Sequence, residues 1–358
     1  MVGNLHNFGG RINMHGDLAL LASNQYSKAK RLDPAVCGSG LFMEAIEQNP
    51  VYYELAFEMP CHPDSIDLRA WLKQYATRRY GAFSPATQKA WMLLLEGPYR
   101  QGTNGTEKSS IVAARPALDV KKSGPNAGLE IPYDPALIIR AQSLLLEDAD
   151  KLSASRPYRF DLVDVQRQMM TNLGQLIHRK AAEAFRSKDR EAFTLHSERF
   201  LGMLADMDTL LRTRSEYSFD RWLTEARSWG ETEEEKNQME RDATSLVTIW
   251  GADGDPRIFD YSWREWAGLI NGYYLPRWQK FYTMLQQHLD EGTSYEEAGL
   301  PQIYGREAFR ANDFYHALAE WELSYVDTYG KARIPATEGD EIDVVKRLFK
   351  KYFKLSQE

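Results

Sequence analysis

Apolar residues recur at helical spacing along most of the chain after residue 60. Positions three and four apart share one face of a helix, so this spacing predicts amphipathic helices. The two longest stripes are separated only by a short polar turn at residues 187–189, and we expect two long helices that pack antiparallel. His178 and His196 fall in these helices, where we expect both on the surface. The stripes are Val163, Met170, Leu173, Ile177, Ala181 and Ala184, followed by Phe193, Phe200, Leu204, Met207 and Leu211.

Helix start and stop signals divide the rest of this region. Three dipeptides place a capping residue before a proline at the first helical position: Asn49-Pro50, Ser84-Pro85 and Asp134-Pro135. Three pairs have the spacing of a capping box: Thr232 with Glu235, Ser262 with Glu265, and Ser294 with Glu297. Further helices are predicted near residues 67–80, 85–96, 135–152, 218–229, 232–249, 262–290, 305–329 and 341–354. The fold class is therefore mainly α.

The first 60 residues follow a different pattern, with short apolar pieces between glycines. Residues 1–5 could end one strand, and Val36-Cys37-Gly38 could end a buried one. Glycine-rich turns after short strands are where an α/β barrel places its active-site loops. After residue 60 we expect no strand except for one possible short pair within residues 110–132.

Composition narrows the function classes. The 358 residues suggest about two domains, and they include 44 Lys plus Arg against 51 Asp plus Glu, a net charge of −7. This balance argues against a nucleic-acid binder, which needs a concentrated basic face. No apolar run approaches the ~18 residues of a membrane span. Two cysteines, Cys37 and Cys61, make no disulfide framework, and aromatic residues, 12% of the chain, suit either a core or a sugar-binding surface.

Metal and cofactor motifs are absent from the sequence. There is no HExxH, CxxC or GxGxxG pattern. Asp253 and Asp255 resemble the start of a calcium loop, but Arg264 occupies the position of its bidentate glutamate, so a turn is the better interpretation. We therefore predict neither a metal site nor a cofactor.

Three segments could carry chemistry. His6 and Asn7, followed by paired glycines, could point donors into a pocket. Glu44 follows a glycine-rich stretch and precedes the helix predicted at Asn49-Pro50, where a carboxylate can be exposed to a substrate. The third segment, residues 248–269, places Trp250 and Tyr261 around a loop between two helices.

Together these segments resemble the alpha-N-acetylglucosaminidase family, glycoside hydrolase family 89. The resemblance runs in order through nearly the whole chain. The matching stretches are residues 5–10 (LHNFGG), 44–52 (EAIEQNPVY), 78–81 (RRYG), 158–162 (YRFDL), 249–251 (IWG), 260–269 and 273–278 (YYLPRW).

The resemblance implies a domain organisation. Residues 1–62 would be the last strand and helix elements of a truncated (β/α) barrel, and residues 63–358 a C-terminal all-helical domain. This boundary agrees with the change of pattern near residue 60. The remainder of the barrel would lie in upstream sequence that this chain does not contain. Family members are secreted or periplasmic in bacteria and lysosomal in animals, and the sequence itself does not identify the compartment.

The resemblance also implies a chemistry. Members remove terminal α-linked N-acetylglucosamine with retention, which requires two carboxylates about 5–5.5 Å apart. Glu44 matches the nucleophile, and the acid/base residue belongs to the absent part of the barrel. His6, Asn7, Trp250 and Tyr261 become candidates for sugar contact, Trp250 either as a wall of the sugar pocket or as helix-end packing.

Two interpretations stay open at this stage. The chain is either the C-terminal part of an exo-acting glycosidase or a stand-alone, non-catalytic helical module that binds a glycan or a partner barrel. For Asp260 the alternatives are contact with a sugar hydroxyl and, slightly favoured, a cap of the following helix.

Overall fold

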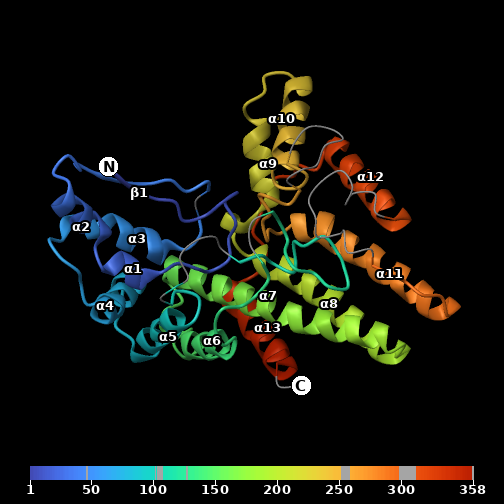
Figure 1. The fold of residues 1–358 in the computed structure, drawn as a ribbon, viewed down its shortest axis with the longest axis horizontal. Helices are drawn as coiled ribbons and strands as arrows, with labels where there is room; N and C mark the ends of the chain where they lie inside the picture. The colour runs from blue at the N-terminus through green and yellow to red at the C-terminus, as the bar shows by residue number, and fades with distance from the viewer. Residues whose placement is uncertain are drawn as a thin grey trace. The chain divides into compact units, whose positions relative to one another are not determined.

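The computed structural model confirms a mainly helical chain (Figure 1). It describes residues 1–45, 47–100, 102, 108–125, 128–250, 259–297 and 312–356. Two compact units share the chain. Unit 1 comprises Met1–Lys108, Glu130–Met169 and Glu341–Glu358, and unit 2 comprises Ser109–Leu129 and Met170–Asp340. The division falls inside the longest helix, α7 (Arg156–Arg186).

The two strands of the described residues form a small parallel sheet in unit 1. They are β1 (Val2–Asn4) and β2 (Ser39–Leu41), with Val2 opposite Ser39. The strand end predicted within residues 1–5 is confirmed. The buried strand predicted to end at Val36-Cys37-Gly38 was wrong, because Val36 closes a turn on Asp33 and the strand begins at Ser39. Both strands are only partly buried.

The other elements of unit 1 are helical. They are α1 (Leu18–Ala22), α2 (Gln25–Leu32), α3 (Pro50–Glu58), the 3-10 turn η1 (Met59–Cys61), α4 (Leu68–Tyr80), α5 (Pro85–Glu96), α6 (Ala136–Glu147), the first half of α7, and α13 (Glu341–Leu355). Ser84 caps α5 through the N–H of Thr87, as predicted. The core of the α4–α5 pair is aromatic, with Tyr75 stacked on Trp71 at 5.2 Å between ring centroids and edge-on to Trp91 at 5.0 Å.

A buried ion pair ties α4 to α7. Arg79 donates two hydrogen bonds, of 2.7 and 2.8 Å, to the carboxylate of Asp161, and the Tyr80 hydroxyl donates a third of 2.8 Å. This bidentate geometry adds directional specificity to the attraction of the charges. The pair therefore fixes the register between the two helices.

Unit 2 is built around a long helical hairpin. It contains the second half of α7, α8 (Arg190–Leu211), the 3-10 turn η2 (Ser215–Tyr217), α9 (Phe219–Arg227), α10 (Glu233–Leu246), the π-turn η3 (Ile270–Tyr274), α11 (Leu275–Glu291) and α12 (Asp313–Asp327). Phe185 contacts Phe193 and His178 contacts Phe200, both with ring centroids 5.9 Å apart. The earlier residue on α7 contacts the later residue on α8, which confirms the antiparallel packing of the two helices (Figure 1).

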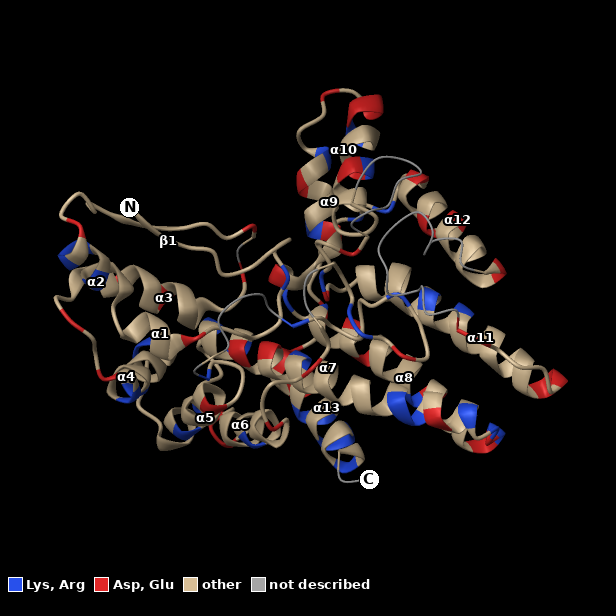
Figure 2. Cartoon of the chain, viewed as in Figure 1, with Lys and Arg blue, Asp and Glu red and all other residues tan. Residues whose placement is uncertain are grey.

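Only one of the three predicted capping boxes is present. Thr232 and Glu235 form it at the start of α10, whose acidic first turn is visible in Figure 2. The boxes predicted at Ser262 and Ser294 were wrong, because no helix begins there and both glutamates serve tertiary contacts. Glu265 accepts hydrogen bonds from the hydroxyls of Ser110 and Thr171. Glu297 accepts from the N–H groups of Leu118 and Asp119.

His178 also departs from expectation. It lies in the core rather than on the helix surface, 4% exposed, with Nδ1 2.9 Å from the hydroxyl of Tyr282. Burial lowers its pKa from 6.5 to about 4, so the ring is neutral near pH 7. Spacing alone did not reveal this, because α8 and α11 cover a face of α7 that carries polar residues.

Further sequence expectations concern loops and charges. Residues 110–132 contain isolated backbone hydrogen bonds, such as Leu129 to Lys121, but no strand among the described residues. Asp253 and Asp255 lie outside the described residues. Basic and acidic residues are interspersed along the helices (Figure 2). None of the described helices is both long enough and apolar enough to cross a membrane.

Candidate active site

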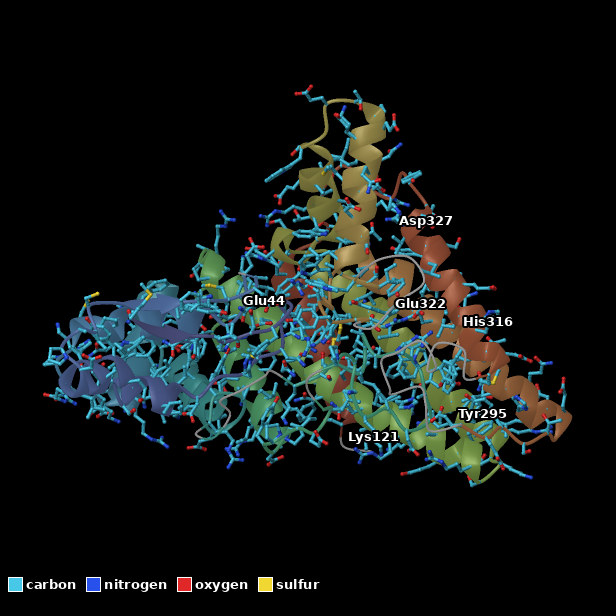
Figure 3. All side chains as sticks on the ribbon, turned by 45° about the horizontal axis from the view of Figure 1, so that its top comes forward. Glu44, Lys121, Tyr295, His316, Glu322 and Asp327 are labelled. Carbon is cyan, nitrogen blue, oxygen red and sulfur yellow. The ribbon has the colours of Figure 1, made fainter. Side chains whose placement is uncertain are left out.

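Glu44 is exposed on the loop between β2 and α3, where hydrogen bonds with Gly9 and Asn7 help to hold it (Figure 3). Its carboxylate oxygen Oε2 accepts a hydrogen bond of 2.6 Å from the N–H of Gly9. Its own backbone N–H donates to Oδ1 of Asn7 at 3.0 Å. The carboxylate is therefore accessible to solvent and yet fixed at both its backbone and its head group.

Asn7 links this loop to its surroundings. The side chain is fully buried, and Nδ2 donates to the carbonyl of Ala45 at 3.3 Å and to the hydroxyl of Tyr53 at 3.4 Å. One amide thus contacts Glu44, Ala45 and α3 together. Because a buried amide loses the water that would otherwise satisfy it, these contacts define its orientation.

His6 is buried in an aromatic cluster next to Asn7. Its ring stacks on His15, with centroids 4.1 Å apart, and packs on Tyr52 at 3.9 Å. Nδ1 lies 3.0 Å from the hydroxyl of Tyr53, and Nε2 lies 3.0 Å from the carbonyl oxygen of His15. Burial, with a smaller contribution from His15, lowers the pKa of His6 well below 6.5, so the ring is neutral.

The segment that follows the paired glycines is anchored to α7. The N–H of Met14 donates to Oε1 of Gln168 at 2.9 Å, and Arg167 donates to the carbonyl of Ile12 at 2.9 Å. Gly9 and Gly10 have φ values of 65° and 70°, in the left-handed region that glycine tolerates. The glycines thus let the chain turn from β1 toward this anchor while an N–H faces Glu44.

The loop from Glu44 to α3 has an unusual backbone. Glu47 and Asn49 have φ values of 65° and 45°, and such residues are held in place by their surroundings. Asn49 precedes α3, but its side chain does not cap the helix as predicted. It instead accepts from the N–H of His15 at 3.0 Å and from the hydroxyl of Tyr99 at 2.8 Å.

Trp250 and Tyr261 form a second group, in unit 2. Their ring centroids lie 4.8 Å apart with an angle of 63° between the ring planes, and both side chains are half-buried. Trp250 also has a positive φ of 42°, and its N–H donates to the carbonyl of Ser245 at 2.7 Å. The two rings thus form a partly exposed aromatic surface on a constrained backbone.

Asp260 belongs to a buried ion network and does not cap a helix, contrary to the slightly favoured interpretation. Arg277 donates to Asp260 at 3.0 and 3.2 Å, to Glu322 at 3.0 Å and to the carbonyl of Ala113 at 2.6 Å. Arg115 donates to Glu322 as well, at 3.0 Å (Glu322 is labelled in Figure 3). Burial raises the pKa of Asp260 to about 7, although Arg277 opposes that rise.

The structure explains why the resembling stretches occur together. Residues 5–10 meet residues 44–52 through the Gly9–Glu44 contact. Residues 78–81 meet residues 158–162 through Arg79 and Asp161, and residues 260–269 meet residues 273–278 through Asp260 and Arg277. The first two pairs of stretches are distant in the sequence, and a polar bond joins the two stretches of every pair.

The predicted site residues therefore fall into two groups. His6, Asn7 and Glu44 come together in unit 1, and Trp250 and Tyr261 come together in unit 2. Sequence reasoning missed Tyr53 and His15, which contact His6. Tyr53 carried one usable signal, since the Asn49-Pro50 start places it at the beginning of the helix that follows the Glu44 loop.

Within the described residues, no three His, Cys, Asp or Glu side chains are grouped so that they could hold a metal ion. The carboxylate of Glu44 accepts from the backbone N–H of Gly9, and the Asn7 amide oxygen accepts from the backbone N–H of Glu44.

Comparison with family models assigns nearly the whole chain. The alpha-N-acetylglucosaminidase (NAGLU) tim-barrel domain matches residues 1–63, and the alpha-N-acetylglucosaminidase (NAGLU) C-terminal domain matches residues 71–351. Among curated proteins, alpha-N-acetylglucosaminidase of Homo sapiens is 32% identical over 358 residues, an alignment that covers 98% of this chain and 44% of the relative. The chain thus spans less than half the length of this relative.

Solved structures of family 89 glycoside hydrolases also match nearly the whole chain. A family 89 glycoside hydrolase from Clostridium perfringens, in complex with PUGNAc, superposes with a TM-score of 0.86 at 28% identity and covers 98% of this chain and 39% of its own. A variant of that hydrolase in which two glutamates are replaced by glutamine, in complex with its substrate GlcNAc-alpha-1,4-galactose, matches with a TM-score of 0.86 at 27% identity, covering 98% of this chain and 38% of its own.

Proposed function

Because this chain belongs to the alpha-N-acetylglucosaminidase family, glycoside hydrolase family 89, we propose that it works as the C-terminal part of an exo-acting, retaining alpha-N-acetylglucosaminidase. The substrate would be a glycan with terminal α-linked N-acetylglucosamine. The observation that carries the proposal is the geometry of Glu44, an exposed carboxylate held by Gly9 and Asn7. The relatives support the substrate class, since one of them is described with GlcNAc-alpha-1,4-galactose as its substrate.

Glu44 would act as the nucleophile. In a retaining reaction one carboxylate attacks the anomeric carbon as a second group protonates the departing oxygen, and water then cleaves the glycosyl-enzyme ester. A nucleophile must reach the sugar, and Glu44 is exposed. It must also keep a fixed position, because small displacements from the attack geometry lower the rate steeply. The acid/base residue would be supplied by the part of the barrel that lies outside this chain.

The remaining predicted residues would support sugar binding. Trp250 and Tyr261 would offer aromatic surface to the apolar face of the pyranose. Direct contact of His6 and Asn7 with the sugar stays a prediction, and their burial favours a role in holding Glu44 in place. We also propose the domain boundary at residues 62 and 63, in keeping with the separate family models, although the compact units divide the chain elsewhere.

Replacement of Glu44 tests this proposal. In the longer enzyme, Glu44→Ala should abolish turnover of an aryl α-N-acetylglucosaminide with a good leaving group. Azide should partly restore it, because azide forms the C1–N bond as the C1–O bond breaks and the aryl group departs. A single displacement gives the β-glycosyl azide, a product that identifies Glu44 as the lost nucleophile.

A neighbouring glutamate provides the control. Glu54 on α3 pairs with Arg78 at the surface, so Glu54→Ala should keep wild-type turnover. If Glu44→Ala retained wild-type turnover too, the proposal would be wrong.

The stand-alone binding module is the competing proposal, and the 358-residue chain itself tests it. Both proposals expect essentially no hydrolysis by this chain alone, but only the module binds N-acetylglucosaminides without added barrel sequence. Calorimetric titration of the chain with methyl α-N-acetylglucosaminide separates the two. Absence of binding by the chain, together with activity of the longer enzyme, would reject the module.

A further inference from the structure

Five residues close a ring of hydrogen bonds next to Glu44. Asn49 Nδ2 donates to Gln48 Oε1 at 2.6 Å, and Gln48 Nε2 donates to the hydroxyl of Tyr53. The hydroxyl lies 3.0 Å from His6 Nδ1, and His6 Nε2 lies 3.0 Å from the carbonyl of His15. The backbone N–H of His15 closes the ring by donating to Asn49 Oδ1 at 3.0 Å.

The direction of every bond in this ring follows from chemistry. A backbone carbonyl only accepts, so His6 Nε2 carries the proton that it shares with His15. Burial keeps the imidazole neutral, and Nδ1 must then accept the hydroxyl proton of Tyr53. Each member therefore donates to the next in one sense, and such aligned chains of hydrogen bonds strengthen one another.

The hydroxyl of Tyr53 connects the hydrogen-bond ring to Asn7, which in turn contacts Glu44. A phenol has one proton and two lone pairs, and here the proton goes to His6 while the lone pairs face Gln48 and Asn7. The Asn7 amide is thereby oriented so that Oδ1 accepts the backbone N–H of Glu44. If the amide turned over, Nδ2 would face that N–H and the contact would be lost.

The ring also explains the backbone of the loop. Glu47 and Asn49 occupy left-handed conformations, which are strained for a non-glycine residue. Gln48 lies between them and is 3% exposed, with both ends of its amide bound within the ring. The hydrogen bonds of the ring offset this strain, and the same loop carries Glu44.

We propose that the Tyr53 hydroxyl is the positioning group of Glu44, acting through Asn7 and the hydrogen-bond ring. The proposal rests on the proposed function of Glu44 as nucleophile. Tyr53 itself touches no reacting atom in this scheme. Its contribution is to keep one amide orientation and one loop conformation, which pre-organises the carboxylate for attack.

The test is Tyr53→Phe in the longer enzyme, which removes the hydroxyl and keeps the aromatic side chain. We expect kcat for the aryl α-N-acetylglucosaminide to fall by roughly 10- to 100-fold, as displacement of a catalytic group does, with KM changed by less than about 3-fold. Tyr26→Phe is the matched control. Tyr26 lies on α2, where its ring faces Lys30, and its replacement should leave both constants unchanged.

A second measurement does not depend on activity. In ¹⁵N spectra of the 358-residue chain, the imine-type signal of His6 Nδ1 should move downfield in Tyr53→Phe, because the nitrogen loses its donor. Replacement of Tyr53 by 3-fluorotyrosine keeps the fold and makes the hydroxyl a stronger donor, so the signal should move upfield. A His6 signal that is identical in all three proteins would contradict the proposed hydrogen-bond ring.

The outcomes separate this inference from the function on which it rests. Wild-type kcat in Tyr53→Phe, beside an inactive Glu44→Ala, would reject Tyr53 as a positioning residue and keep Glu44 as nucleophile. Full activity in both variants would reject the proposed function itself. Loss of kcat in Tyr53→Phe with an unchanged His6 signal would also reject the inference, since the effect would not pass through the ring.

Discussion

The backbone N–H of Gly9 donates a hydrogen bond of 2.6 Å to the carboxylate of Glu44. The two residues are 35 positions apart, and each belongs to a loop that follows one of the two paired strands. Parallel strands bring their carboxyl ends to the same edge, so the loops after β1 and β2 meet there. The contact therefore follows from strand pairing combined with a left-handed glycine.

Glu44→Gln should separate the structural role of this residue from its chemical one. The amide oxygen can still accept from Gly9, and the side chain is exposed, so the free energy of unfolding should change by less than about 0.5 kcal/mol. Urea unfolding of the 358-residue chain measures this. Turnover by the longer enzyme should nevertheless be lost, because a neutral amide does not form the glycosyl ester. A destabilisation of several kcal/mol would assign Glu44 to the fold instead.

Gly16 should not tolerate a side chain. Its φ is 137°, and a Cβ would lie 2.6 Å from Cδ2 of Tyr52 and 3.1 Å from Nε2 of His6. Gly16→Ala should therefore destabilise the chain by roughly 1–3 kcal/mol through strain and overpacking. Urea unfolding gives the value, and displaced His6 ring signals should accompany it. Gly38→Ala is the control, since a Cβ there meets nothing within 4 Å. Equal stabilities of the two variants would contradict the packing around His6.

Arg277→Met should be strongly destabilising. Arg277 is fully buried and pairs with Asp260 and Glu322, so its removal takes away the arginine that pairs with the buried Asp260, while Glu322 keeps its ion pair with Arg115. Loss of one partner from a buried ion network costs about 3–5 kcal/mol. Chemical denaturation of the wild type and the variant checks the value.

Lys346→Met serves as the comparison for that experiment. Lys346 pairs with Asp150 at the surface, with side-chain exposures of 46% and 96%. A solvent-exposed pair contributes about 0–1 kcal/mol. Comparable losses in the two variants would show that Arg277 is solvated in solution.

The stability of the chain should depend on pH through His178. Burial lowers its folded-state pKa to about 4, below the ordinary value of 6.5. Below pH 6.5 the unfolded chain binds a proton that the folded chain does not, so this contribution is present above pH 6.5 and lost as the pH falls toward 4. Complete loss would amount to about 3.5 kcal/mol at roughly 1.4 kcal/mol per pKa unit.

A histidine pair tests this assignment. His178→Phe removes a partner of Tyr282 and should be less stable at pH 7.5, but it should lose less stability than the wild type between pH 7.5 and 4.5. His316 is exposed, and His316→Gln serves as the surface control, whose free energy of unfolding at pH 7.5 should equal that of the wild type. Identical slopes in His178→Phe and the wild type would place the titration elsewhere.

Most helices could be predicted from local sequence. Ser84-Pro85 and Thr232 with Glu235 start helices as their spacing indicates, because a cap depends on atoms within one turn. The same spacing at Ser262 and Ser294 failed, since Glu265 and Glu297 bind donors distant in the sequence. Residue spacing carries no information about such partners.

For the candidate site, too, the sequence determined some features and the tertiary structure determined others. The ordered motifs identified the family and singled out Glu44, because residue identity alone carries that information. Tertiary structure decided that Gly9 and Asn7 hold Glu44, that Asp260 is a buried partner of Arg277, and that Tyr53 connects His6 to Asn7. The sequence by itself thus determined where most of the helices lie and which carboxylate to consider. Which polar groups satisfy one another was decided by the fold, because burial removes water and leaves each group only the partners that the folded chain brings within reach.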